Sequence, residues 1–217
     1  ESDGRSGGPG AGGPGADGPS ATDPVDKTNL PGEKPYYGEV DPEVAERWEK
    51  MDKDEREQVA QAMLDEEMER YGLDPVTIDF APIDANGRWS FNSEDGHAVE
   101  ISGDDLSDPR LLHTIAHEAR HAAQWEAAQD TEAGALDWLP FVDSTEGDYE
   151  RLEEEHGFTR DEIDSWRDHW DTPKEERGPN LDQSVERDAR DAGAEFSDGL
   201  TMEDLERIIE QMDGRVS

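Results

Sequence analysis

Between residues 41 and 72, apolar residues recur at helical spacing in a stretch that is otherwise heavily charged. Asp41 followed by Pro42 indicates a helix start, because Asp caps free amide groups and Pro fits the first helical position. The pattern predicts an amphipathic helix, with a weak break at Asp52-Lys53 that would divide it in two. The apolar positions of this stretch are Val44, Trp48, Met51, Val59, Met63, Leu64 and Met68.

Between residues 75 and 102 the apolar residues alternate instead, which indicates β-strands. Asn86-Gly87 is a strong signal for a tight hairpin turn between the first two strands. A third short strand is expected from His97 to Ser102. Together these segments predict a small antiparallel sheet. The alternating residues of the first two strands are Val76, Ile78, Phe80, Trp89 and Phe91.

The remainder of the chain has the character of helices joined by loops. Asp108-Pro109 is expected to open a helix with the sequence DPRLLHTIAHEARHAAQWEAA. Thr201 and Asp204 match a capping box in which Asp replaces the usual Glu. Helices after a small sheet place the chain in the α+β class. The three later helices are expected to begin at Thr159, at Asp182 or Ser184, and at Thr201.

Residues 1–40 lack any such periodicity. They hold ten of the 21 Gly and six of the 13 Pro, in stretches such as GGPGAGGPGADGPS. This composition cannot bury a core, so we expect a flexible linker followed by one domain over residues 41–217. The chain begins with Glu1 rather than Met, and no signal-peptide pattern follows, which favours a piece of a longer polypeptide.

The charge is strongly one-sided, with 58 acidic residues, 20 basic residues and a formal net charge of −38. Repulsion over most of the surface argues against nucleic acid and anionic membranes as partners. Lys is scarce, with five residues against fifteen Arg. An acid-rich, Lys-poor chain is typical of salt-loving organisms, and the alternative is an ordinary acidic protein. The absence of Cys excludes disulfides, thiolate metal sites and a Cys nucleophile.

Residues 117–121 read His-Glu-Ala-Arg-His, which matches the motif HExxH. On a helix, His117 and His121 project from one face, one turn apart, and can hold one metal ion. Glu118 then points at the open position of the metal, where it can act as a general base and later as a general acid. Apolar residues on the other side of this helix predict that it packs into the core. The alternative is a charged surface helix with two incidental His.

The stretch LLHTIAHEARHAAQ, preceded by short strands and followed by SVERDARDAGAEF, resembles the short zincin metallopeptidases. It is most similar to those found as C-terminal toxin modules of secreted and polymorphic toxin systems. These modules combine a segment like HE-x-x-H-x-x-Q with a later E-x-x-A helix that carries the third metal ligand. The resemblance covers residues 75–200. It implies a zincin-like fold with an edge strand along the substrate cleft, one Zn²⁺, a peptide or protein substrate and an immunity protein as partner.

A zinc peptidase needs a third protein ligand besides the two His of its motif. A metzincin would carry a His at the position of Ala127 and a Gly at the position of Gln124, so that class is excluded. The thermolysin-like NExxSD pattern is also absent. The third ligand must therefore come from elsewhere in the chain.

Two acidic residues of the later helix are the main candidates for this ligand. Glu186 shares its helical stripe with Ala189 and Gly193, whose small side chains would let the two helices approach closely. Asp188 lies on a stripe of acidic residues, which indicates a solvated face. The spacing and the family pattern both favour Glu186. The remaining candidates are Glu195, His156 and His169.

Other polar and aromatic residues are less informative. His113 lies one turn before His117 and is expected to line the cleft rather than to bind the metal. The sequence does not select among three residues that can donate a hydrogen bond to an oxyanion, namely Tyr149, His156 and His169. Four Trp are expected to be core anchors rather than substrate platforms, because each can bury a large apolar area. They are Trp125, Trp138, Trp166 and Trp170.

The favoured function is zinc-dependent hydrolysis of peptide bonds, with one Zn²⁺ on His117, His121 and Glu186 and with Glu118 as the general base. Two other classes stay open. One is a zincin-fold binding module that keeps its metal without turnover, against which the retained Glu118 argues. The other is a non-enzymatic acidic protein that captures basic partners through charge.

Overall fold

The computed structural model describes residues 34–104, 106–131, 144–179 and 182–215. Helices and a small sheet alternate along this part of the chain, so it belongs to the α+β class, as predicted. The elements are α1 (Pro42–Lys50), α2 (Lys53–Arg70), β1 (Ile78–Ala81), β2 (Gly87–Asn92), β3 (Gly96–Ser102), α3 (Arg110–Asp130), α4 (Ser144–His156), α5 (Arg160–Asp171), the 3₁₀ turn η1 (Lys174–Glu176), α6 (Ser184–Gly199) and α7 (Met202–Arg215).

The capping signals of the sequence mark the helix starts correctly. The Asp41 side chain accepts a hydrogen bond from the Glu43 amide at the start of α1. Asp52 does the same for the Glu55 amide, so the predicted break divides the first helical stretch into α1 and α2. The Thr159 capping box starts α5, and Thr201 and Asp204 bond reciprocally at the start of α7. No capping signal predicted the start of helix α4.

The sheet differs from the prediction of an antiparallel one. Its strand order is β1-β3-β2, with β1 parallel to β3 and β2 antiparallel to β3. Strand β3 takes the centre because it contributes the fully buried Val99 and Ile101. Gly87 has no positive φ, whereas a type I′ hairpin turn needs one at both central residues. Asn86-Gly87 therefore does not join β1 to β2 in a tight turn, and β2 pairs with β3 across the turn at residues 93–95.

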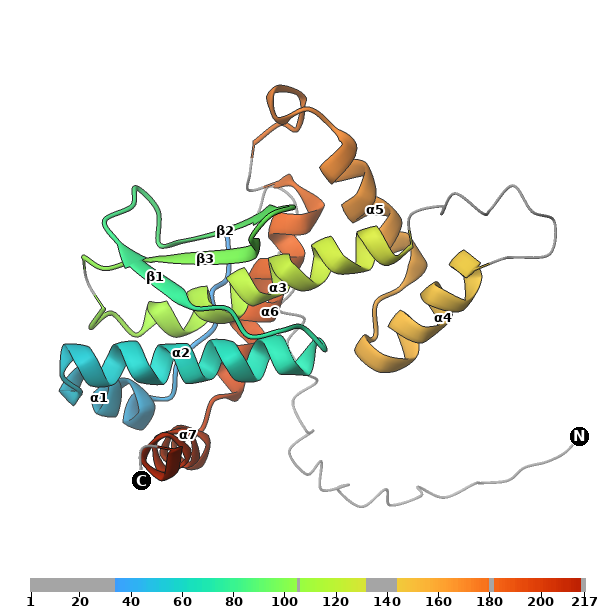
Figure 1. Cartoon of the computed structure of the whole chain (residues 1–217). Coiled ribbons are helices and arrows are strands. Elements are labelled where there is room, and N and C mark those ends of the chain that lie inside the picture. Colours follow the sequence, from blue (N-terminus) through green and yellow to red (C-terminus); the bar gives the residue numbers. More distant parts are fainter. Residues whose placement is uncertain (1–33, 105, 132–143, 180–181, 216–217) are drawn as a thin grey trace, which may run out of the picture.

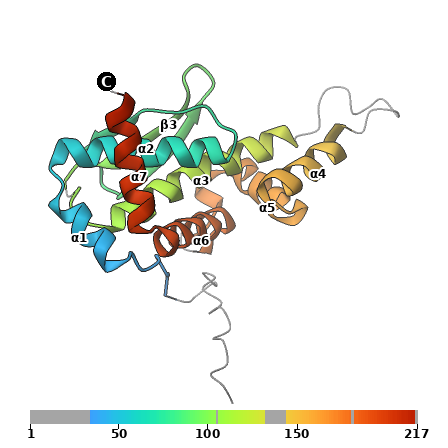
Figure 2. The same cartoon turned by 90° about the horizontal axis from the view of Figure 1, so that it is seen from below.

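Helix α3 is the central element. It lies between the sheet and α2, and α6 packs across it (Figure 1). Seen from below, α7 crosses α2 on the side away from the sheet (Figure 2). Within the described residues, no helix combines the length and the apolar character that crossing a membrane requires. Large buried side chains of the core include Trp48, Met63, Leu64, Leu112, Ile115, Phe158 and Trp166.

The segment before α1 contacts α6. The hydroxyl of Tyr36 donates to the Asp198 carboxylate at 2.8 Å, and the Glu39 amide donates to the same oxygen at 2.8 Å. Gly38 adopts a φ of 77°, and a Cβ there would lie 2.6 Å from the Ala194 carbonyl oxygen. Most of the predicted linker, residues 1–33, lies outside the described residues. Its last part, from Tyr36, packs against the rest of the described structure.

Candidate metal centre

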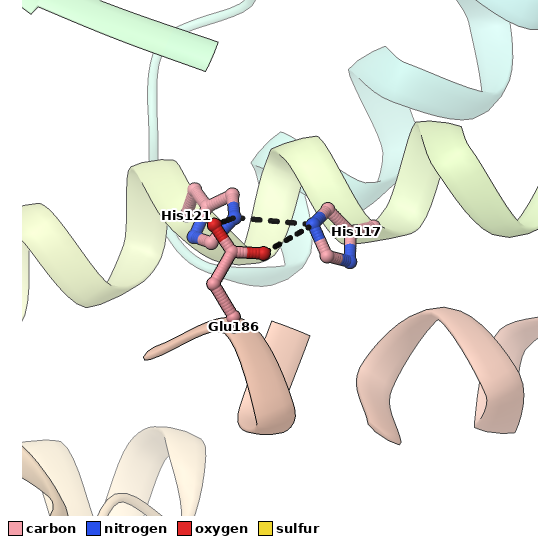
Figure 3. A group of neighbouring side chains, drawn as sticks. All are labelled: His117, His121 and Glu186. Carbon is pink, nitrogen blue, oxygen red and sulfur yellow. Dashed lines mark hydrogen bonds and ion pairs between the residues drawn. The ribbon is translucent and has the colours of Figure 1, made fainter. Parts of the chain in front are cut away.

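Three side chains converge where α6 crosses α3. The Nε2 atoms of His117 and His121 are 3.1 Å apart. The Glu186 carboxylate extends from α6 toward both rings (Figure 3), with one oxygen 3.5 Å from His117 Nε2 and the other 3.7 Å from His121 Nε2. The three residues form a group that could hold a metal ion, with all ligand atoms within 4.8 Å of one another.

The local sequence explains this convergence. Residues four apart on a helix project from one face, which brings the two imidazoles of α3 together. Small residues let α6 approach: Ala189 is fully buried, and a Cβ at Gly193 would lie 2.7 Å from His113 Nε2. The small residues that share the helical stripe of Glu186 therefore do let α6 approach α3 closely, as predicted. This approach brings a carboxylate from a helix 65 residues downstream into reach of the motif.

The protonation states suit metal binding. Burial lowers the pKa of His121 to about 4, so its ring is neutral at neutral pH. Burial alone would raise the pKa of Glu186, but its hydrogen bond to His117 and the neighbouring His rings outweigh burial and lower that pKa to about 2. A neutral imidazole and an ionised carboxylate are the forms in which these residues bind a metal.

A hydrogen-bond chain fixes the orientation of His121. The Gln124 side-chain amide donates to the Val185 carbonyl at 2.9 Å and to the Asp188 carboxylate at 2.6 Å. Its carbonyl oxygen therefore faces His121 Nδ1, 2.9 Å away, and accepts the hydrogen of that nitrogen. The lone pair of His121 is thus left on Nε2, the atom that faces Glu186 and His117.

Asp188, the alternative third ligand, has another role. Arg120 Nε and a terminal nitrogen donate to its two oxygens at 2.7 and 2.8 Å, in a bidentate pair. The Arg120 guanidinium itself lies 4.3 Å from the centre of the Phe158 ring. The interpretation of Asp188 as part of a solvated face is wrong, because its carboxylate pairs with Arg120, which occupies the second x position of HExxH. Periodicity along α6 alone could not reveal that partner.

The other candidate ligands do not join the group. Glu195 is exposed on α6, and His156 packs against Tyr71 and Phe158. His169 is near but outside the group that could hold the ion, and so is His113, whose Nε2 lies 3.3 Å from the Arg190 carbonyl.

Glu118 lies next to the metal-binding group and is only 4% exposed. Burial raises its pKa to about 7, while the His117 ring and the Trp89 backbone act in the opposite direction. Strand β2 approaches it closely, because a Cβ at Gly87 would lie 2.7 Å from a Glu118 carboxylate oxygen. Gly87 therefore has a structural role, but that role is to let β2 approach α3 closely rather than to form the predicted turn.

A cleft extends from the centre in two directions. On one side is a cavity of about 830 Å³, and on the other a cavity of about 330 Å³. Gly87, His117, Glu118 and Glu186 line both. The metal-binding group thus lies in the middle of the cleft, where an extended molecule could pass it on both sides.

The Trp predictions have three outcomes. Trp166 is a core residue, as predicted. Trp125 and Trp170 line the larger cavity, so the prediction is wrong for Trp125, whereas Trp170 also packs against the core. Trp138 lies outside the described residues.

Of the possible oxyanion donors, only one lines this cleft among the described residues. The Tyr149 hydroxyl pairs with Asp164 and Arg167, away from the cleft, and His169 lines the larger cavity. Tyr37 lines the smaller cavity. No sequence signal marks it as a site residue, because it falls within the predicted linker.

Comparisons of this chain with known proteins found no relative. No family model, no curated protein and no solved structure matches this chain. The resemblance to zincins therefore rests on the sequence motifs, and function has to be argued from the geometry of the site.

Proposed function

We propose that this chain is a zinc-dependent peptidase and, from its motif resemblance, a toxin module of a larger polypeptide. One observation carries the proposal. A carboxylate from the distant α6 meets the two His of HExxH, while the Glu of the same motif is buried beside them at a cleft. If the two His were incidental residues on a surface helix, neither a carboxylate from α6 facing them nor a buried Glu118 beside them would be expected.

The donor set and its spacing fit zinc. Two His and one Glu, with a fourth position open, form a ligand set used in zinc peptidases. Ligand atoms about 2.1 Å from a tetrahedral ion lie about 3.4 Å apart. The two His nitrogens here are 3.1 Å apart, and each lies 3.5 or 3.7 Å from a different oxygen of Glu186. When bound, Zn²⁺ would supply a Lewis acid that polarises the scissile carbonyl and acidifies water.

Glu118 would move the protons of the reaction. Its carboxylate accepts a proton from the attacking water and then donates it to the departing amine. Glu118 is suited to this role by its position, buried beside the metal-binding group and lining the cleft. Strand β2 holds the carboxylate against α3, because there is no side chain at position 87 to separate them.

Strand β2 would bind the peptide backbone. It is an edge strand, since among the described strands it pairs only with β3, and its residues 87–91 line the larger cavity. An extended peptide can add to such an edge through main-chain hydrogen bonds. Since cavities lie on both sides of the metal-binding group, this arrangement favours cleavage within a chain over removal of terminal residues.

A Glu118→Gln variant tests the proposal and separates the enzyme from a binding module. The amide cannot accept a proton, so turnover should fall about 10²–10⁴-fold while folding and zinc content stay unchanged. Glu153→Gln, on the exposed face of α4, is the matched control and should keep full activity. Wild-type peptidase activity in Glu118→Gln would place the chemistry elsewhere. A wild-type chain that binds zinc but hydrolyses no peptide would favour the binding module.

A further inference from the structure

The larger cavity has an aromatic wall next to the metal-binding group. Ring centres of Trp89 and Trp170 are 5.5 Å apart, and those of Trp125 and Trp170 are 5.6 Å apart. Phe91 extends the wall, with its ring centre 5.2 Å from that of Trp125. Trp89 also lies 6.3 Å from the ring of His121, so the wall begins at the metal-binding group itself.

These rings are not all hidden in the core. Only two large hydrophobic side chains are exposed among the described residues, Phe91 at 38% and Tyr37 at 46%. Each lines one of the two cavities of the cleft. Exposed large apolar side chains that gather at a cleft, as these do within the described part of the chain, are typical of a binding site.

The charge of the same cavity contrasts with that of the chain. Acidic residues outnumber basic ones by 58 to 20 overall, yet among the described residues the only acidic ones that line the cavity are Glu186 of the metal-binding group and its neighbour Glu118. The other charged residues of its lining are basic: Arg88, Lys174 and Arg177.

Two of these basic residues differ from the third in having no acidic partner among the described residues. Arg88 is paired with Glu100 on the neighbouring strand. Within the described part of the chain, neither Lys174 nor Arg177 has an ion-pair partner. Hydrogen bonds to the Thr172 and Trp170 carbonyls hold the Arg177 side chain in place at the cavity. The segment that carries both residues follows α5 and lines the cavity together with β2.

From these two features we infer the substrate class: an extended peptide with a bulky aromatic side chain beside the scissile bond and an acidic residue next to it. The aromatic side chain would stack within the wall, and the acidic one would pair with Lys174 and Arg177. A basic side chain could also contact aromatic rings, but these two cations would repel it. The inference rests on the proposed function for its turnover, whereas the binding preference stands without it.

Peptide binding can be measured without cleavage. Zinc-loaded Glu118→Gln chain would be titrated, at one ionic strength, with fluorescent hexapeptides containing Phe-Glu, Phe-Lys or Ala-Glu. The Phe-Glu peptide should bind about tenfold more tightly than either of the others, because aromatic anchors and charge pairs each contribute to affinity. Equal affinity for the three peptides would overturn the inference.

Substitutions then assign the preference to its residues. Lys174→Glu should weaken Phe-Glu binding about three- to tenfold and leave Ala-Ala peptides unaffected, whereas Lys53→Glu, an exposed Lys outside the cavity lining, should change neither. Trp125→Leu should reduce the advantage of Phe over Ala while zinc content stays at the wild-type level. If both cavity variants behave like wild type, the subsite does not exist.

The same peptides distinguish failure of this inference from failure of the proposed function. If wild type hydrolyses all three peptides with equal kcat/KM, the proposed peptidase function stands and the proposed substrate preference is excluded. If the chain binds the Phe-Glu peptide most tightly but wild type hydrolyses none of the peptides, the binding preference stands and the peptidase function is excluded.

Discussion

The two sides of the metal-binding group differ in how they are built. Toward α6, His121 is held by Gln124, which is held in turn by Asp188 and Arg120 in a packed, charged network. Toward β2, the group faces an open cavity walled by aromatic rings. His117, between the two, has a buried Nδ1 without a hydrogen-bond partner among the described residues. The packed side therefore fixes the orientation of His121, whereas the other side of the group opens to the larger cavity.

The largest effect should come from removing Asp188 on the packed side. Asp188→Ala would leave the Arg120 charge, 13% exposed, without its bidentate partner. Breaking a fully buried pair costs about 3–5 kcal/mol of unfolding free energy, and the loss here should lie near the lower value because the Asp188 side chain is 21% exposed. Glu195→Ala, on the exposed face of the same helix, is the control and should change little. Denaturant unfolding measures both variants. Equal losses in the two would show that the network does not stabilise the fold.

A smaller effect is expected at Gln124, whose side-chain oxygen orients the metal-binding residue His121. Gln124→Leu removes the acceptor for His121 Nδ1 while keeping a similar volume. Losing an orienting partner of this kind typically weakens metal binding about 10–100-fold. Competition with a zinc chelator gives the affinity. Wild-type affinity in this variant would mean that the packed side does not orient His121.

The smallest effect concerns residues 34–40, which extend the packed side along α6. A chain that starts at Asp41 loses the hydrogen bonds of Tyr36 and Glu39 to Asp198 and should lose about 1–2 kcal/mol of stability. A chain that starts at Lys34 should match the full-length protein in thermal unfolding. If both truncations are equally stable, this segment contributes nothing and the domain begins at residue 41.

The sequence predicted those parts of the molecule that depend on local spacing. Helix starts followed from caps such as Asp52, and the His pair followed from its four-residue separation. Glu186 could be preferred because small residues on its stripe predict a close helix contact. The strand order could not be predicted, because Asn86-Gly87 resembles a turn and only packing against Glu118 shows what Gly87 does.

The remaining differences arise from partners far apart in the sequence. Asp188 pairs with Arg120 across 68 residues, and periodicity along one helix cannot show such a pair. The aromatic wall joins β2, α3 and α5. The apolar area of Trp125, which favoured a place in the core, therefore packs against rings of other elements at the cavity instead. Tyr37 was overlooked because Gly and Pro dominate the segment before it.

The most direct test of this account is the zinc content of protein purified without added metal. We expect one Zn²⁺ per chain in wild type, and a large loss of affinity in Glu186→Ala, because the third ligand is then missing. Glu195→Ala, a change of the same kind outside the group, should keep the wild-type content. Absence of zinc from wild type, or zinc bound as tightly by Glu186→Ala as by wild type, would contradict the assignment of the centre to His117, His121 and Glu186.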